Sequence, residues 1–248
     1  MEAAHIIRDC VAQVTALRES TAAQAGLREA AHAVKRFQAQ RFGGTYADLL
    51  ASKTFSGATR FFLVELYSEK DYSARDSQFA RIAGALESFF PKQVVGTAVA
   101  MAQLHALTEE LDYQMAKAWQ ASSFTGNGQE FGRYLASWDA VGRQADRSQQ
   151  LEVVLQVGQE LERLTRKPGL RTMLRMMRKP ASLAGLAALQ SFLEAGFDTF
   201  ADMAGKRSTV SEFLGTIRQR ESAWIERLFA ADRVTCETEL RLCLGKAP

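Results

Sequence analysis

Four side chains in one helical segment have types and spacing that suit acid–base chemistry. Met101, His105, Glu109 and Asp112 follow one another at intervals of four, four and three residues, which places them on one stripe of an α-helix. The Glu109 carboxylate could hydrogen-bond the imidazole, fixing its tautomer and raising its basicity. Such a pair would serve as a general base, or as a histidine that ligates a metal or tetrapyrrole.

Glu65 is a candidate partner for this histidine from another helix. It is the only charged residue in the apolar run FFLVELY at 61–67. An unpaired carboxylate inside such a run would be strongly destabilising, so we expect Arg60 or Arg75 to balance it. Three interpretations stay open for the group: a polar network that only sets helix register, a metal- or tetrapyrrole-binding site, and an acid–base catalyst.

The sequence lacks the motifs that usually identify an enzyme or a metal site. It contains no phosphate-binding GxxxxGK[ST], no HExxH, no GxSxG and no CxxC. It also lacks the Glu-x-x-His pairs of ferritin-like di-iron proteins, and it has only three histidines. We therefore predict no metal site from motifs, and neither a cofactor nor a catalytic activity follows from them.

The positive charge of the chain is concentrated in one segment. Seven of the 31 basic residues lie in 163–179, which contains no acidic residue. In the rest of the chain the 28 acidic residues therefore outnumber the basic ones. Arg171, Arg175 and Arg178 recur at helical spacing and form one row. The opposing side of this basic amphipathic helix is apolar: Leu170, Met173, Leu174 and Met177.

The segment 163–179 predicts a binding protein that contacts an acidic protein or an anionic small ligand. Nucleic acid is an unfavourable partner because the segment has no interleaved aromatic residues and the remaining chain is acidic. An alternative is a solvated face whose methionines join the core. Association with a second copy of the chain also stays open.

The termini and cysteines indicate a cytoplasmic protein. The first residues, MEAAHIIRDC, lack the basic start and apolar run of a secretory signal. The most apolar stretch, 94–107, is shorter than the roughly 18 residues a membrane-spanning helix needs. Cys10, Cys236 and Cys243 form no paired motif, which suits reduced thiols.

Helical periodicity runs along the whole chain, and no segment of length alternates with period two. We predict an all-α fold: a compact many-helix bundle with two central apolar helices at 61–67 and 94–107. These two stretches are expected to be buried on every side. Residues 1–248 are predicted to form a single helical domain, with two subdomains divided near 122–128 as the alternative. The predicted helices are 5–40, 45–52, 57–69, 73–90, 92–122, 128–145, 147–166, 169–179, 181–205 and 209–231.

Several segments also resemble a known family. FFLVELY at 61–67 is followed by Asp71, Arg75 and Asp76, and then by LHALTEELD at 104–112. The likeness continues through RKPASLAGLAALQSFLEAGF at 178–197 and IRQRESAWIERLF at 217–229. In these residues the chain is similar to a family of uncharacterised, largely helical bacterial proteins. The resemblance covers most of the chain and implies a soluble bacterial protein, but it transfers no catalytic residue.

Overall fold

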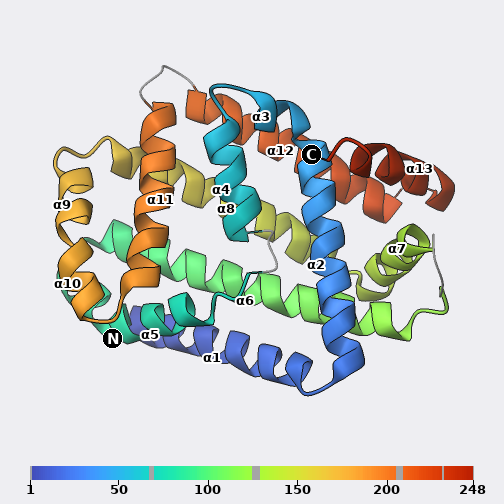
Figure 1. Cartoon of the computed structure of the whole chain (residues 1–248), viewed down its shortest axis with the longest axis horizontal. Helices are drawn as coiled ribbons and strands as arrows, with labels where there is room; N and C mark the ends of the chain where they lie inside the picture. Colours follow the sequence, from blue (N-terminus) through green and yellow to red (C-terminus); the bar gives the residue numbers. More distant parts are fainter. Residues whose placement is uncertain (1, 67–69, 125–128, 205–208, 231, 248) are drawn as a thin grey trace. The chain divides into compact units, whose positions relative to one another are not determined.

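The computed structural model describes residues 2–66, 70–124, 129–204, 209–230 and 232–247. Within these ranges the chain forms thirteen α-helices and no strand (Figure 1). The all-α prediction is therefore confirmed. None of the described helices combines the length and the apolar character needed to cross a membrane.

The helices divide between two compact units, each made of three stretches of chain. Unit 1 comprises Met1–Thr15, Asp71–Ala106 and Glu152–Gly215, and unit 2 comprises Ala16–Lys70, Leu107–Leu151 and Thr216–Pro248. The single-domain prediction and its alternative of a division near 122–128 stay predictions, and residues 125–128 lie outside the described ranges. The helices are α1 (Glu2–Ala22), α2 (Ala25–Thr45), α3 (Ala47–Ala51), α4 (Ser56–Leu66), α5 (Ser73–Phe89), α6 (Lys92–Ala121), α7 (Glu130–Val141), α8 (Gln144–Thr165), α9 (Leu170–Met176), α10 (Arg178–Leu183), α11 (Ala187–Ala204), α12 (Thr209–Ala230) and α13 (Arg233–Leu244).

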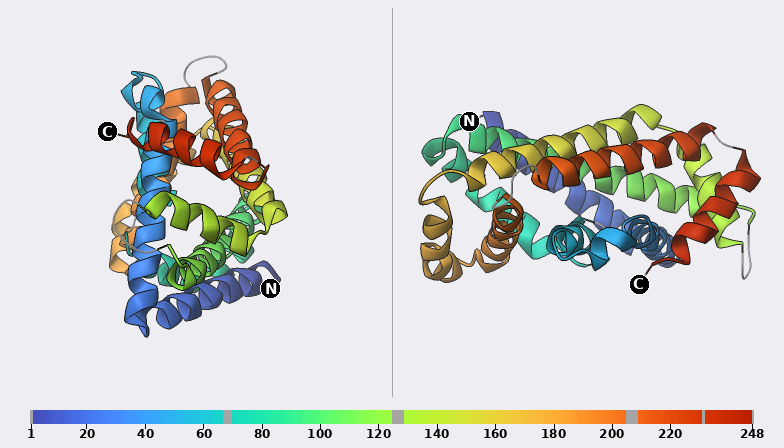
Figure 2. Two further views of the ribbon diagram at one scale, coloured as in Figure 1. Left: turned by 90° about the vertical axis from the view of Figure 1, so that its right-hand side faces the viewer. Right: turned by 90° about the horizontal axis from the view of Figure 1, so that it is seen from above.

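Small residues bring three helices of unit 1 together. Ala4 and Ile7 of α1 pack against Ala83 of α5 and Ala102 of α6, and all four are buried. Alanines at such positions allow helix axes to approach closely, because little side-chain volume separates them. On another side of α5 lies α11, which also packs against α9 and α10 (Figure 2). The basic segment 163–179 therefore runs from the end of α8 through α9 into the start of α10, and α11 packs against α9 and α10.

Unit 2 has a larger, aromatic core. The Phe37 ring of α2 stacks on Tyr134 of α7 at 4.2 Å between centroids, and Tyr134 lies beside Trp138 at 5.9 Å. Leu27 and Val34 of α2 are buried in the same cluster. Stacked aromatic residues of this size bury much apolar area and contribute strongly to stability. The cluster also contains Met115, Trp119, Trp224, Leu228, Cys236 and Leu240.

The predicted helix 5–40 is broken in the structure. α1 ends at Ala22 and α2 begins at Ala25, with Gln24 in an extended conformation (φ −122°, ψ 108°). The nearest glycine, Gly26, lies inside the first turn of α2 and no proline is close, so the local sequence gives little indication of a break at Gln24. The change of direction lets Leu27 and Val34 enter the core of unit 2, which outweighs uninterrupted helical hydrogen bonding.

The last helix, α13, was not among the predicted helices. Asp232 caps it by accepting a hydrogen bond from the Thr235 backbone N–H at 3.0 Å. Its buried residues are Cys236, Leu240 and Cys243, spaced by four and three. This periodicity was the available signal, and it is weak because twelve residues give only three turns.

Burial on every side is wrong for both apolar stretches. In α4, Phe62 is buried whereas the flanking Phe61 and Leu63 are only half-buried, and Tyr67 lies outside the described residues. In α6, Ala102 is buried and the adjacent Gln103 is exposed. Apolar side chains commonly extend beyond the buried face of a helix, so an apolar run does not require a fully buried one.

Candidate functional site

The α9–α10 surface, defined here as residues 170–183, is bounded by two glycines in a conformation that other residues rarely adopt. Gly169 has φ +80° and Gly185 has φ +69°, both in the left-handed region. Glycine reaches this region without steric cost because it has no Cβ. These two turns set α9 and α10 off from the long helices before and after them.

The α9–α10 surface exposes apolar side chains. No residue of α9 is buried, and Met173 is 43% exposed, Met176 73%, Met177 45% and Leu183, in α10, 91%. The interpretation in which these methionines join the core is therefore wrong. Polar contacts join α9 to α11: the Gln190 side-chain amide donates to the Leu174 carbonyl at 2.6 Å.

The three predicted arginines lie together and face acidic residues of α11. The Arg171 Nε lies 2.6 Å from Asp198 Oδ1, and Arg175 Nη2 lies 3.8 Å from the other oxygen of that carboxylate. Arg178 Nε lies 2.7 Å from Glu194 Oε2. The positive excess of the segment is thus largely balanced by acids that lie elsewhere in the sequence.

The arginine members of these ion pairs are exposed, whereas the side chain of Glu194 is only 14% exposed. The three arginine side chains are 43–60% exposed. Exposed pairs contribute roughly 0–1 kcal/mol each, because water screens the charges and ordering two long side chains carries an entropy penalty. The contacts of Arg171 and Arg175 with Asp198 therefore contribute little to stability.

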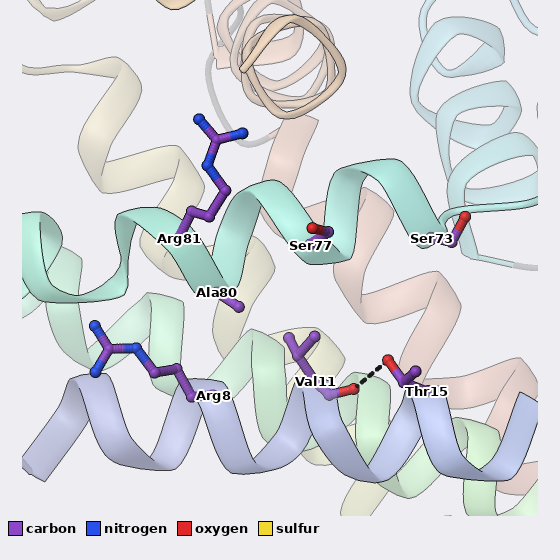
Figure 3. Close-up of a pocket in the computed structure, with 7 residues that line it drawn as sticks. All are labelled: Arg8, Val11, Thr15, Ser73, Ser77, Ala80 and Arg81. Carbon is purple, nitrogen blue, oxygen red and sulfur yellow. Dashed lines mark hydrogen bonds between the residues drawn. The ribbon is translucent and has the colours of Figure 1, made fainter. Parts of the chain in front are cut away.

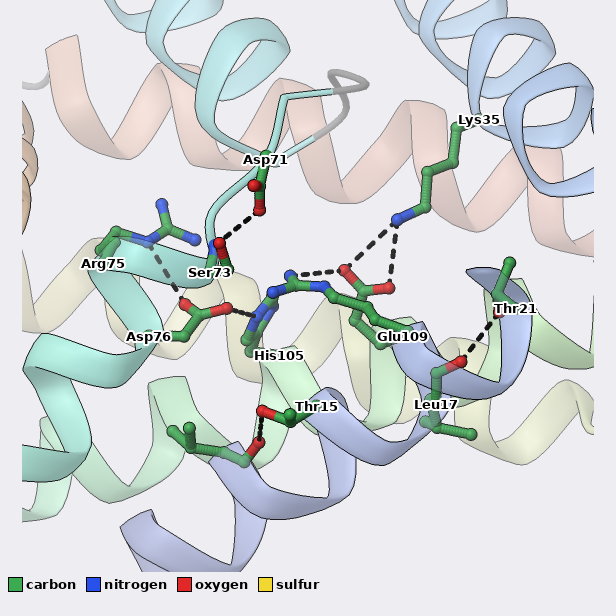
Figure 4. A network of polar contacts seen from close by, with 12 residues as sticks. Thr15, Leu17, Thr21, Lys35, Asp71, Ser73, Arg75, Asp76, His105 and Glu109 are labelled. Atoms are coloured by element: carbon green, nitrogen blue, oxygen red, sulfur yellow. Dashed lines mark hydrogen bonds and ion pairs between the residues drawn. The ribbon is translucent and has the colours of Figure 1, made fainter. Parts of the chain in front are cut away.

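His105 has a carboxylate partner that sequence reasoning missed. Its Nε2 lies 2.9 Å from Oδ2 of the buried Asp76 in α5, within unit 1 (Figure 4). Arg75 Nε lies 3.6 Å from the other oxygen of Asp76, and its guanidinium stacks on the rings of Tyr72 (4.1 Å) and Phe192 (4.5 Å). An aspartate in the first turn of a helix usually serves the helix end, so its spacing gave no sign of this role.

Glu109 has cationic partners within unit 2. Arg18 Nη2 donates to its Oε1 at 2.9 Å, and Lys35 Nζ donates to its Oε2 at 3.1 Å (Figure 4). Burial acts to raise the pKa of Glu109, but the charges and hydrogen bonds of Lys35 and Arg18 outweigh it, so the pKa lies below its usual value. The predicted bond from Glu109 to His105 stays a prediction; the cationic partners keep the carboxylate charged.

The remaining predicted residues have other surroundings. Glu65 lies 3.9 Å from Lys70 Nζ, within unit 2. Asp112 is buried and accepts a hydrogen bond from the Gln38 amide at 3.2 Å. Burial raises the pKa of its carboxyl, in opposition to the attraction of Lys35 and Arg147. Among the residues that the structure describes, no three His, Cys, Asp or Glu side chains are grouped in a way that could hold a metal ion.

Replacing Glu109 by glutamine should destabilise the protein at neutral pH by about 1–3 kcal/mol, the worth of charge-assisted hydrogen bonds. Because the folded pKa lies below the unfolded one, the stabilisation is fully present above about pH 4.3 and is lost as the pH falls through the folded value. Urea denaturation of both proteins between about pH 7 and pH 3 measures the difference, which should shrink in acid.

The matched control is Asp112→Asn on the same helix. The folded pKa of Asp112 is raised, so its ionisation opposes folding as the pH rises above the unfolded value. This variant should gain stability relative to the natural protein with increasing pH. A Glu109→Gln effect that stayed constant over the whole range would contradict the described partners of Glu109.

One protein family matches the chain over most of its length. The family model described as "Domain of unknown function (DUF8198)" matches residues 17–235. This chain belongs to that family. Membership confirms the resemblance to an uncharacterised family and assigns no activity. No curated protein and no solved structure matches the chain.

The DUF8198 match contains the sites described above. The α9–α10 surface, His105 and Glu109 lie inside residues 17–235, as do their partners in α2, α5 and α11. Most of α1 and most of α13 lie outside it.

Proposed function

We propose that this protein is a cytoplasmic interaction protein that binds an acidic segment of another protein through the α9–α10 surface. The observation that carries the proposal is a helix without a buried residue, α9, along and just after which Met173, Met176 and Met177 are exposed beside arginines. Contiguous exposed apolar side chains rimmed by polar ones are typical of protein–protein contact surfaces. Methionine suits such surfaces because its unbranched, polarisable side chain adapts to different partners.

The chemistry of the surface defines its partner. Apolar side chains of the partner would cover Met173, Met176 and Leu183, and carboxylates would replace those of α11 on Arg171 and Arg178. Full burial of one such apolar side chain contributes roughly 1.5–3 kcal/mol. Exchange of exposed ion pairs is close to neutral in free energy. Affinity would therefore come from the methionines and leucine, whereas the arginines select an acidic partner and speed association.

Photo-crosslinking in living cells tests the proposal. A benzophenone-bearing amino acid in place of Met176 should form an adduct with another protein, and mass spectrometry should place the crosslink in an acidic segment. The same amino acid in place of Leu242, an exposed apolar residue of α13, is the matched control and should give no such adduct. Changing Arg171, Arg175 and Arg178 together to glutamine should reduce the adduct at 176 without unfolding the protein, because glutamine is a good helix former.

Three outcomes would contradict the proposal. One is an adduct only with a second copy of this chain, which would make the surface a self-association interface. Another is equal adduct formation at positions 176 and 242, which indicates random collision. The third is a crosslinked segment without acidic residues, or an adduct that is insensitive to the arginine changes.

The alternative function is a metal- or tetrapyrrole-binding protein, or an enzyme, built around the His105 and Glu109 network. The hydrogen bond between His105 and Asp76 favours it, because a carboxylate that orients an imidazole is the usual second element of a general base or a histidine ligand. The ring stack that restrains Arg75 would keep Asp76 in place.

A further inference from the structure

The turn between α5 and α6 exposes two adjacent phenylalanine side chains. Residues 88–93 are all exposed, and among them Phe89 is 84% exposed and Phe90 is 40% exposed. Phenylalanine is among the residues most often buried in proteins, so packing within unit 1 does not explain two exposed rings at one helix end. The turn therefore presents an apolar tip to its surroundings.

Basic side chains lie beside this apolar tip. Gln93, in the first turn of α6, accepts a hydrogen bond from Lys167 Nζ at 3.2 Å and donates one to Glu160 of α8 at 2.5 Å. The end of α8 thus lies next to the start of α6 within unit 1 (Figure 1, Figure 2). We define the tip surface as the two phenylalanines together with four basic residues of these helix ends: Phe89, Phe90, Lys92, Arg163, Arg166 and Lys167.

The arginines of the tip surface are more exposed than the acids beside them. Their side chains are 65% and 63% exposed, whereas the carboxylates that pair with them are 18% and 25% exposed; the pairs are Arg163 with Glu160 and Arg166 with Glu162. Another molecule that approaches the tip surface therefore meets the guanidinium groups more readily than the carboxylates.

The two lysines of the tip surface carry charge that is not balanced by ion pairs. No carboxylate of the described residues lies within ion-pair distance of Lys92 or Lys167. Lys92 is also the first residue of α6, where a positive charge opposes the helix dipole, and the first turn contains no acidic residue. Helix stability therefore does not account for a lysine at this position, whereas attraction to an anionic surface outside the protein does.

The arginines that line the groove between α1 and α5 do not converge in the same way. This groove has a volume of about 600 Å³, and its charged lining residues are Arg8 and Arg81. Figure 3 shows Arg81 pointing away from α1, and its Nη2 donates to the Ala184 carbonyl at 2.6 Å. The groove therefore does not bring two guanidinium groups to one anion.

We propose that the tip surface attaches unit 1 to an anionic lipid membrane. The rings of Phe89 and Phe90 enter the boundary between headgroups and acyl chains, and the basic side chains contact the anionic headgroups. A fluid bilayer admits two rings on an exposed turn without a matching hollow, whereas the same two rings bury too little area for a stable protein interface. The attachment is peripheral, and it does not depend on the protein partner proposed for the α9–α10 surface.

Vesicle flotation tests the proposal. Vesicles of phosphatidylcholine and phosphatidylglycerol in equal amounts should bind the protein saturably, and binding should weaken as ionic strength rises. Vesicles of phosphatidylcholine alone should bind it far more weakly. Phe89→Ala should lower the affinity about tenfold, because one inserted apolar side chain is lost. Lys92→Gln combined with Lys167→Gln should lower it about tenfold or more, since each basic residue near an anionic membrane contributes about fivefold.

The matched controls lie in unit 2. Lys53→Gln combined with Lys117→Gln removes the same charge from exposed lysines outside the tip surface, and Leu242→Ala shortens another exposed apolar side chain. Both should bind the mixed vesicles as the natural protein does. Equal weakening by the two double lysine variants would overturn the proposal in favour of general charge attraction. Equal binding to both kinds of vesicle, or unchanged binding of Phe89→Ala, would also overturn it.

Position 89 itself distinguishes a lipid contact from a protein contact. The fluorescence of Phe89→Trp should shift to the blue on the mixed vesicles and be quenched by lipids with brominated acyl chains, relative to the natural protein. Vesicle binding without this shift would place the lipid contact elsewhere and overturn the proposal. A benzophenone-bearing amino acid at position 89 that forms an adduct with a protein in cells, without vesicle binding of the purified protein, would make the tip surface a protein interface instead.

Discussion

Glu221→Ala should lower the free energy of unfolding by about 3–5 kcal/mol, because it leaves a buried cation without its counter-ion. Arg41 donates to the two oxygens of Glu221 at 3.1 and 2.8 Å, and both residues are buried within unit 2. The hydroxyl of the fully buried Tyr46 also donates to Glu221, at 2.9 Å. One carboxylate therefore satisfies donors from α2 and from the residue that follows it. Removing it takes three hydrogen bonds from donors that lie away from water.

Asp48→Asn supplies the control for Glu221→Ala. Asp48 forms a bidentate salt bridge with Arg220, with N–O distances of 2.7 and 2.8 Å, similar in geometry to the Arg41–Glu221 pair. Its side chain, however, is 59% exposed. Its removal should therefore change stability by no more than about 1 kcal/mol. Urea denaturation of the two variants makes the comparison. Similar small losses in both would contradict the burial of Arg41 and Glu221.

Gly44→Ala should destabilise the protein by on the order of 3 kcal/mol, the upper range for overpacking a core. A Cβ on Gly44 would overlap the Cys243 carbonyl oxygen and lie 2.7 Å from its carbonyl carbon. Both clashing atoms belong to the backbone of α13, so no side-chain rotation can relieve them. Alanine favours helix over glycine by about 1 kcal/mol, which is too little to offset the overlap.

Gly215→Ala distinguishes the clash from the general effect of adding a methyl group to a helix. Gly215 lies inside α12, and a Cβ there would have no atom within 4 Å. That variant should gain about 0.4–1 kcal/mol, because alanine restricts the unfolded chain more than glycine does. Thermal and urea unfolding of both variants give the two signs. A stabilised Gly44→Ala protein would mean that α13 does not pack on α2.

Most of the helices could be predicted from the sequence, whereas the contacts between them could not. Helical periodicity is a local property, so the row Arg171, Arg175 and Arg178 was identified without knowledge of the fold. The break at Gln24 was missed because its cause is the burial of Leu27, which is a tertiary effect. α13 was missed because three apolar positions give too short a pattern.

The other contacts that the sequence did not predict join residues that are distant in the sequence. Asp76 reaches His105 across 29 positions, and Arg18 reaches Glu109 across 91. No spacing rule covers such separations, so the partners of both residues had to come from the structure. Charge counting located the basic segment but not the acids on α11 that balance it.

The absence of a buried residue in α9 has a consequence for the rate of amide hydrogen exchange. Helices with a buried apolar face usually open only when the whole protein unfolds. α9 has no buried residue, and its contacts with α11 include the Arg171–Asp198 ion pair and the hydrogen bond from Gln190. Its amide protons should exchange through local opening, at a free energy far below that of global unfolding. Salt weakens ion pairs, so the opening should become more frequent as ionic strength rises. A bound partner would suppress this local opening, so the protection of the α9 amides would report the fraction of the protein that has the partner bound.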